Sequence, residues 1–459
     1  MEGFAVAASK VMERFVTDRP LCVMTRCVLG HLMTPALDDV FSRCRERQYE
    51  GEIKFSALAT SVADVALNFC GNFNQAYLAH KKGIAASVVA YYGKLNRVEP
   101  CISEGVVIFS WHKAGELLRE IGAPPEKVLP GYKCSVLDGN HLQKTEKRIS
   151  ELRGLWAAAL PGTVVAKFNL EEQLFQRAYL LEDAHAQESS VLDRVVADLQ
   201  ADELLIADRH FCIVRFLLGV AKKLGCFVIR QHGRLKGELL GKRQQLGRVS
   251  TGMVFEQQMR IGDGDEQLIV RRITIELDVP TRDGDLQIHL LSNVPVKHAG
   301  ARQLAELYHQ RWEIENAFHV LTMTLTCEVK SIGHPRAALF LFCTAMLAYN
   351  CRQVLFGALR TVHDPSAVEN MSHHSVALEI SKPMDGLITA IPEREWDQLV
   401  PCTAPSRARF LCRVARRVDV HSHKKAVRGP KKLQPPRKQC AMGTHVATHR
   451  LLQQRKETH

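Results

Sequence analysis

Apolar residues recur at intervals of three or four positions through the first 130 residues, and this spacing is typical of helices. The segments PALDDVFSRCRERQ (35–48) and KFSALATSVADVALNF (54–69) show it most clearly. Strand patterns are sparse in this part of the chain. We therefore predict that residues 1–130 form a mostly helical region.

The pattern changes at Lys133, where short apolar runs begin to alternate with helical segments. Three strand-like runs precede a predicted helix at 191–200, and a fourth strand, a helix at 210–225 and a fifth strand follow. The runs are KCSVLDG (133–139), GTVVAKF (162–168), LFQRAYLL (174–181), ELLIAD (203–208) and CFVIR (226–230). This order predicts an α/β layer with Asp138 and Asp208 at the carboxyl ends of strands, where open sheets commonly carry functional groups.

Beyond Gly237 the pattern becomes one of alternation between apolar and polar residues. In the run RITIELDVP (272–280) apolar and polar residues alternate, and the turn sequences GDGDE (262–266) and TRDGD (281–285) flank it. This pattern predicts an all-β insertion over 237–291. The longest apolar run, AALFLFCTAMLAY (337–349), is shorter than the roughly 18 residues expected of a membrane span. It predicts a buried core helix.

The segment ELYHQRWEIENAF (306–318) combines an apolar stripe with a polar one. In a single helix Tyr308, Arg311 and Glu315 would lie within about 60° of one another, beside an apolar stripe that includes Ile314 and Phe318. One interpretation is a surface helix with an ordinary Arg311–Glu315 ion pair, worth roughly 0.2 to 0.5 kcal/mol. The other is a helix that packs with one stripe and presents chemistry with the next.

Composition and length are those of a soluble globular protein. The 459 residues allow about two to four domains, and 46% are hydrophobic and 24% charged. Charged residues interrupt the first 19 positions, so no signal peptide is predicted. The 14 cysteines include no repeated Cys-x-x-Cys pair, which favours reduced thiols in a cytoplasmic protein.

The net charge of +12 lies entirely in the last part of the chain. Residues 407–459 hold 15 Lys and Arg against two acids, which leaves 46 bases and 47 acids in the remainder. We predict a flexible basic arm that binds phosphate backbones, with a merely solubilising charge run as the alternative. Cys440, His445 and His449 have a loosely zinc-like spacing, but no second cysteine pair accompanies them.

Asp138, Asp208 and Glu315 lie on three separate predicted elements. Enzymes that cut phosphodiesters commonly use two divalent cations, and Mg²⁺ prefers carboxylate oxygens, so two or three acids suffice to hold the ions. Each acid also has a plain structural explanation. Asp138-Gly139 is a turn dipeptide, and Asp208 could cap the helix that follows it.

Taken together, these motifs resemble the bacterial insertion-sequence DDE transposases of the Tyr-Arg-Glu-Lys signature group. The resemblance lies in LDGN around Asp138, IADRHF around Asp208 and YHQRWEIE ending on Glu315, supported by HLLSNVP and AMLAYN, and it covers roughly residues 133–352. It implies a ribonuclease H-like catalytic core interrupted by the β insertion. It also implies two Mg²⁺ ions, which Mn²⁺ may replace, and cut-and-paste cleavage and strand transfer by a homodimer on terminal inverted repeats and target DNA.

Carried over to this sequence, the resemblance makes Asp138, Asp208 and Glu315 the catalytic metal ligands, and makes Tyr308 and Arg311 DNA-binding residues. Two positions depart from the family. Thr322 stands where the signature has Lys, and the insertion lacks tryptophan. The alternatives are a DDE-like nuclease without strand transfer, and a catalytically impaired copy that only binds DNA.

The expected organisation has six parts. They are a helical DNA-binding region (1–130), the first part of the core (131–236), the β insertion (237–291), the second part of the core (292–362), a connector (363–406) and the basic tail (407–459).

Overall fold

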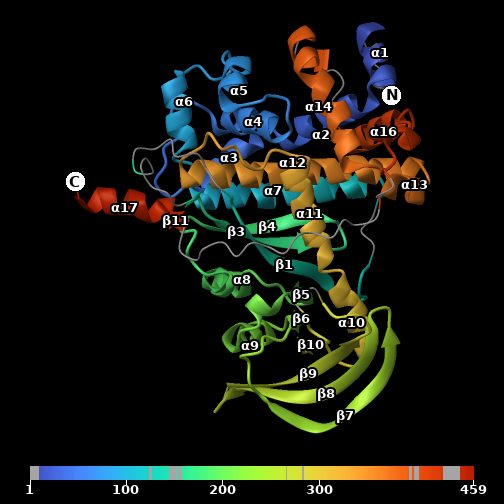
Figure 1. Ribbon diagram of the computed structural model, residues 1–459. Helices are drawn as coiled ribbons and strands as arrows, with labels where there is room; N and C mark the ends of the chain where they lie inside the picture. The colour runs from blue at the N-terminus through green and yellow to red at the C-terminus, as the bar shows by residue number, and fades with distance from the viewer. Residues whose placement is uncertain are drawn as a thin grey trace.

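The computed structural model describes residues 10–123, 127–143, 151, 158–264, 266–281, 284–391, 395–396, 403–426, 429 and 445–458. It shows a mixed α/β protein in which one large sheet is layered between helices (Figure 1). The expected α/β class is therefore confirmed.

In the described part of the chain seven helices precede the first strand; α7 packs directly on the sheet, and α2 and α3 pack on α7. Proline begins α2 and α7, where its missing N–H costs nothing, and Asn72 and Ser87 cap α5 and α6 with their side chains. Many of their apolar residues belong to the same hydrophobic cluster as the sheet, so these helices are not a separate body (Figure 1). The helices are α1 (Lys10–Asp18), α2 (Pro20–Leu32), α3 (Ala36–Cys44), α4 (Phe55–Ala66), α5 (Phe73–Ala79), α6 (Val88–Leu95) and α7 (Pro100–Glu120).

Five strands form the centre of the sheet in the order β4-β3-β1-β5-β6. Strand β3 is antiparallel to β1 and β4, whereas β5 is parallel to both β1 and β6. Strands β3 and β5 are buried along their whole length, which explains their mostly apolar sequences; the buried Lys167 and Glu203 are paired with each other. The strands are β1 (Lys133–His141), β3 (Thr163–Asn169), β4 (Leu174–Leu181), β5 (Glu203–Ala207) and β6 (Cys226–Arg230).

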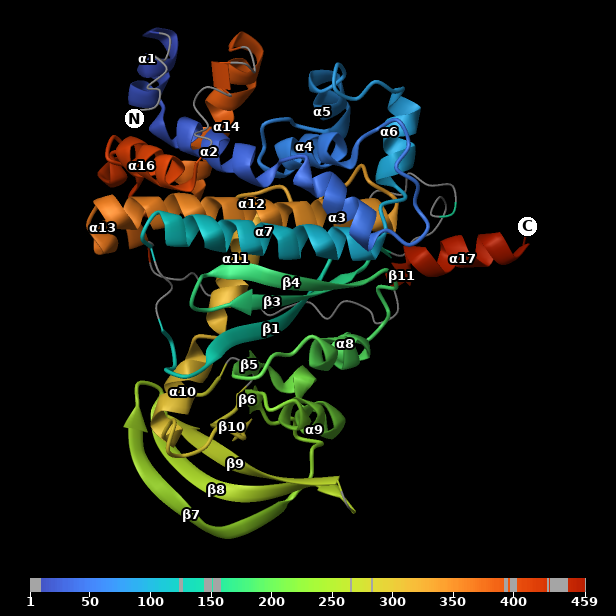
Figure 2. The same cartoon turned by 180° about the vertical axis from the view of Figure 1, so that it is seen from behind.

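Four antiparallel strands extend this sheet beyond β6 in the order β10-β9-β8-β7. The predicted β insertion therefore continues the central sheet, and its far strands curve strongly (Figure 2). These strands are β7 (Glu238–Val249), β8 (Gly252–Asp263), β9 (Glu266–Leu277) and β10 (Gln287–Ser292).

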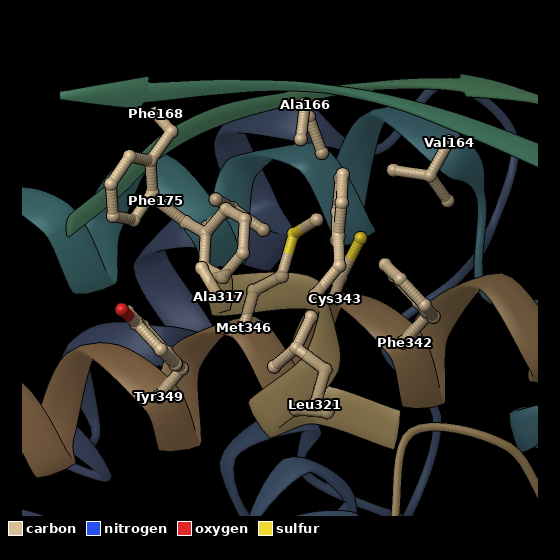
Figure 3. Packing of buried hydrophobic residues seen from close by; sticks show 14 of the residues in the cluster. Val164, Ala166, Phe168, Phe175, Ala317, Leu321, Phe342, Cys343, Met346 and Tyr349 are labelled. Carbon is tan, nitrogen blue, oxygen red and sulfur yellow. The ribbon is translucent and has the colours of Figure 1, made fainter. Parts of the chain in front are cut away.

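Alternate residues of the central strands bury opposite faces of the sheet. Val136 joins the cluster under α7 and α12, while Leu137 joins the cluster under α8 (Leu192–Ala197) and α9 (Val214–Lys222). Figure 3 shows the first face, where Phe168 and Phe175 meet Met346 and Tyr349. The central strand β1 is thus held from both sides.

The core helix expected at 337–349 is confirmed as part of α12 (Pro335–Val362). By length and composition α12 resembles a membrane span, but its apolar window is 100% buried inside the protein. It lies beside α7 over the sheet (Figure 1).

The single helix expected at 306–318 is wrong. The structure has two helices, α10 (Ala301–His309) and α11 (Trp312–Met323), separated by a turn at Gln310 and Arg311. The backbone N–H groups of Gln310 and Arg311 bond three residues back, to Leu307 and Tyr308, so the α-helical ladder is broken there. Arg311 consequently stands at the N-terminal end of α11.

The prediction of a flexible arm beginning at Arg407 is wrong for the first part of that segment. Residues Ala404–Ala415 form α16, which buries Phe410, Leu411 and Val414 in a core with α2 and α12. The Arg407 guanidinium lies 3.3 Å from a carboxylate oxygen of Glu120.

The rest of the C-terminal region contains α13 (Pro365–Glu369), α14 (His373–Ala390), the 3-10 helix η4 (Val420–His423) and α17 (Thr448–Thr458). A short strand, β11 (His445–Ala447), pairs with β2 (Ala158–Leu160). Of the loosely zinc-like residues, Cys440 lies outside the described residues, so the zinc site is not tested.

Candidate active site

The parallel pairing of β1 with β5 brings Asp138 and Asp208 together. Leu137 is paired with Ala207, so the next residue on each strand is an aspartate. Neighbouring strands lie about 4.8 Å apart, which places the two carboxylates side by side at the same edge of the sheet. Asp208 also accepts a 2.8 Å hydrogen bond from the His210 N–H, which caps a short 3-10 helix (Arg209–Phe211) and not the longer helix α9 that follows.

Arg311 connects Asp138 to Glu315. Its guanidinium donates to Asp138 Oδ2 at 3.3 Å and to Glu315 Oε1 at 2.6 Å, and its side chain is only 14% exposed. Helix α11 is fixed in this position because Ile314, Phe318 and neighbouring apolar residues pack into the main core. The polar stripe predicted from sequence therefore faces the two aspartates despite the break in the helix.

The electrostatics of the site centre on Asp138. Burial raises the pKa of Asp138 to about 7, and the negative charges of Asp208 and Glu315 also raise it. The Arg311 guanidinium and the Gly139 N–H act in the opposite direction. These effects show that the three predicted acids share one electrostatic environment.

Tyr308 lies at the end of α10 and packs against the main core. Burial raises the pKa of Tyr308 to about 12, while the Arg311 guanidinium, which contacts its hydroxyl, lowers it. The neutral Tyr308 hydroxyl therefore accepts a contact from the Arg311 guanidinium and helps to hold it in position.

A pocket of about 910 Å³ opens beside the two aspartates. Its wall includes Asp138, Gly139, His141, Glu188, Asp208 and His210. Sequence reasoning missed Glu188 and His141, which lie outside the signature motifs, and did not single out His210, which lies within IADRHF. The only sequence signal for Glu188 was the glycine at position 139. Sequence reasoning considered Gly139 part of a turn, whereas the structure places it inside β1.

No three Asp, Glu, His or Cys side chains in the described parts of the chain are grouped closely enough to hold an ion as they stand. The Arg311 guanidinium instead supplies positive charge between Asp138 and Glu315. By the chemistry of their donors, the carboxylates of Asp138, Asp208 and Glu315 fit a hard divalent cation. The metal site thus stays a prediction.

Two further side chains on α11 lie at or beyond the Arg311 end of the site. Trp312 is 54% exposed, and its ring centroid lies 5.6 Å from the guanidinium carbon of Arg311. Thr322, at the position where the signature that the sequence resembles has lysine, donates its hydroxyl to the carbonyls of Phe318 and His319. Thr322 therefore adds no positive charge near the acids.

Comparison with known proteins gives one family match. Residues 163–351 match a family model described as the transposase DDE domain. A search of curated proteins gave no match. Among solved structures, the piggyBac transposase synaptic complex with hairpin DNA aligns with 84% of this chain and 86% of its own, at 9% identity and a TM-score of 0.42.

The matched segment includes Asp208 and Glu315 but begins after Asp138. Asp138 is therefore assigned by its position beside Asp208 and its bond to Arg311. The chain contains a region, residues 163–351, that matches the DDE domain of transposases.

Proposed function

We propose that this protein is a DNA transposase that cuts the ends of a mobile element and joins them to target DNA. The observation that carries the proposal is the convergence of Asp138, Asp208 and Glu315, with Arg311 bonded to two of them. The Tyr-Arg-Glu-Lys group of insertion-sequence transposases is the finer assignment, supported by YHQRWEIE (308–315).

A ribonuclease H-like core is part of this proposal. Its support is the order β4-β3-β1-β5-β6, with one antiparallel pair on each side of β3 and parallel pairing from β1 to β6. Asp138 and Asp208 directly follow the last pair of the parallel β1–β5 ladder, in the region where open α/β sheets place their chemistry.

Asp138, Asp208 and Glu315 would hold Mg²⁺, with two ions expected and Mn²⁺ able to substitute. Bound divalent cations activate the attacking hydroxyl and stabilise the leaving oxygen of the phosphodiester. The planar Arg311 guanidinium suits two-point binding of a phosphate oxygen pair, and Tyr308 holds that guanidinium in place. The exposed Trp312 ring beside it offers a stacking surface for a base.

The partners in this proposal are the terminal inverted repeats and target DNA, bound by a homodimer in the bacterial cytoplasm. Incubating the purified chain with its flanking inverted repeats and Mg²⁺, and then sequencing the ends, tests the function directly. Cleavage at the repeat boundary is expected, and its absence with intact repeats would overturn the proposal.

A nuclease without strand transfer and an impaired DNA-binding copy are the competing functions. Thr322 favours the impaired copy, because it removes a charge that the signature group places on this helix. Integration of cut ends into a supercoiled plasmid separates the three functions. The transposase produces joined products, the nuclease only cut ends, and the impaired copy neither.

The basic C-terminal segment gives a prediction about salt dependence. Replacing Arg428, Lys431, Lys432, Arg437 and Lys438 by Gln removes five positive charges without touching α16 or α17. We expect weaker non-specific DNA binding, with the slope of log K against log salt flatter by about 0.9 for each lost phosphate contact. Binding titrations at several salt concentrations measure this, and an unchanged slope would show that these residues do not contact DNA.

The raised pKa of Asp138 gives a prediction about pH. Because a carboxylate binds cations only after it loses its proton, affinity for Mn²⁺ should rise as pH increases through about 7 and then level off. Without a cation the same shift should lower the free energy of unfolding as pH rises from about 4 to 7, because the unfolded state deprotonates first. Asp138→Asn should remove both effects, and a pH profile that it leaves unchanged would contradict the assignment.

A further inference from the structure

Gly139 occupies an unusual place for a glycine, because nothing in its backbone requires one. It lies within β1 and is paired in register with Val165 of β3. It is not among the residues with positive φ. The reason for the glycine must therefore be space.

The space is taken by the side chain of Glu188. A Cβ added at Gly139 would lie 1.8 Å from Glu188 Oε1, 2.3 Å from its Cδ and 3.0 Å from its Oε2. Any larger residue at position 139 would displace this carboxylate. Asp138 thus carries one acid on β1, and Gly139 leaves room for a second one on the other face of the same strand.

The backbone around Glu188 holds the side chain in this position. Glu188 begins the 3-10 helix η2 (Glu188–Val191), whose last residue Val191 is buried. Val191 belongs to the same apolar cluster as Leu137 and Val165 of the sheet. Glu188 is therefore anchored to the strands that it covers, and is not a free surface side chain.

Glu188 lies among negatively charged groups that a bound cation would stabilise. It shares the pocket wall with Asp138 and Asp208. Within the described residues its carboxylate forms no hydrogen bond or ion pair, and the basic groups that act on it are the His141 and His210 rings. Arg311, the full positive charge of the site, is engaged by Asp138 and Glu315 instead.

We propose that Glu188 is a fourth carboxylate ligand of the divalent-cation site, and that Gly139 is a glycine because the Glu188 carboxylate occupies the space of its side chain. The inference rests on the proposed function and extends it. With Glu188, the wall of the pocket presents oxygen ligands from β1, from the end of β5 and from η2. Hard cations such as Mg²⁺ and Mn²⁺ prefer such all-oxygen sets.

Binding of Mn²⁺ to the purified full-length chain, followed by electron paramagnetic resonance, tests the proposal without relying on catalysis. We expect Glu188→Gln to weaken Mn²⁺ binding by about 10-fold or to remove one bound ion. The matched control is Glu306→Gln, which removes the same charge from an exposed position on α10 outside the pocket. Wild-type binding by Glu188→Gln, with weakened binding by Asp138→Asn, would overturn the role of Glu188 and leave the proposed function standing.

If Asp138→Asn and Asp208→Asn also bind Mn²⁺ as the wild type does, the metal site of the proposed function itself fails. The two failures are therefore distinguishable in one set of titrations. Thermal unfolding of each variant shows whether a loss of binding reflects a loss of fold.

Gly139→Ala tests the steric half of the proposal. We expect it to weaken Mn²⁺ binding to the level of Glu188→Ala, because the new methyl group displaces the carboxylate. In the Glu188→Ala background the same change should have no further effect, since the obstacle has gone. An additional loss in the double variant would show that Gly139 acts on Asp138 and not through Glu188.

Discussion

Replacing Asp138 or Asp208 by Asn, or Glu315 by Gln, is expected to lower Mg²⁺-dependent cleavage of inverted-repeat DNA by about 10³-fold or more. Each change keeps the size of the side chain but removes an anionic oxygen, and groups that act as one unit fail together. Binding of the same DNA should change little, because these acids repel phosphate. End-labelled DNA on denaturing gels measures cleavage, and gel shifts measure binding.

Glu313→Gln is the matched control for Glu315→Gln. It lies two residues away on α11 and carries the same charge, but the Arg311 guanidinium bonds to Asp138 and Glu315 and not to it. Its cleavage should remain within a few-fold of wild type. Wild-type cleavage by Glu315→Gln would remove Glu315 from the site, whatever the other two acids do.

Lys167→Met is expected to lower the free energy of unfolding by about 3 to 5 kcal/mol. Lys167 on β3 forms an ion pair with Glu203 on β5, across the catalytic strand β1, and both side chains are only 2% exposed. Burial lowers the pKa of Lys167, and the charge of Glu203 opposes this. Removing the lysine leaves Glu203 buried with its main counter-charge gone. Chemical denaturation measures the loss.

The companion variants decide whether charge is the cause. The double change Lys167→Met with Glu203→Leu should recover much of the stability, because no unpaired charge remains in the core. Arg215→Met, in the exposed pair with Asp193, should change stability little, since both side chains are largely exposed. A Lys167→Met variant as stable as Arg215→Met would show that water reaches the buried pair.

Local patterns in the sequence determined most of the elements. The strands expected at 133–139, 162–168, 174–181, 203–208 and 226–230 agree with the structure to within two residues, and the core helix expected at 337–349 lies within α12. These segments are buried, so their hydrophobic pattern follows directly from the face or faces that they must cover. The same logic placed Asp138 and Asp208 at strand ends. Asp208 does follow the last residue of β5, but the placement of Asp138 is wrong, because β1 continues past it to His141.

Charge composition and the amphipathic pattern of one segment predicted the structure less well. The helix at 306–318 is broken at Gln310 and Arg311, although its amphipathic pattern runs through the break without interruption. The segment after Arg407 looked like a basic arm, but α16 buries its few apolar residues and pairs Arg407 with Glu120. In both cases packing against distant parts of the chain outweighed the local signal.

The sequence by itself therefore determined the α/β class, the position of Asp208 after β5 and the polar stripe of Tyr308, Arg311 and Glu315, because these depend on local periodicity. Only the tertiary structure decided that Arg311 joins Asp138 to Glu315, residues 177 positions apart in the chain, and that Glu188 lies over Gly139. Such contacts arise when strand register and loop packing bring separate segments together. No local pattern encodes them, because each depends on how the whole sheet and its covering helices are assembled.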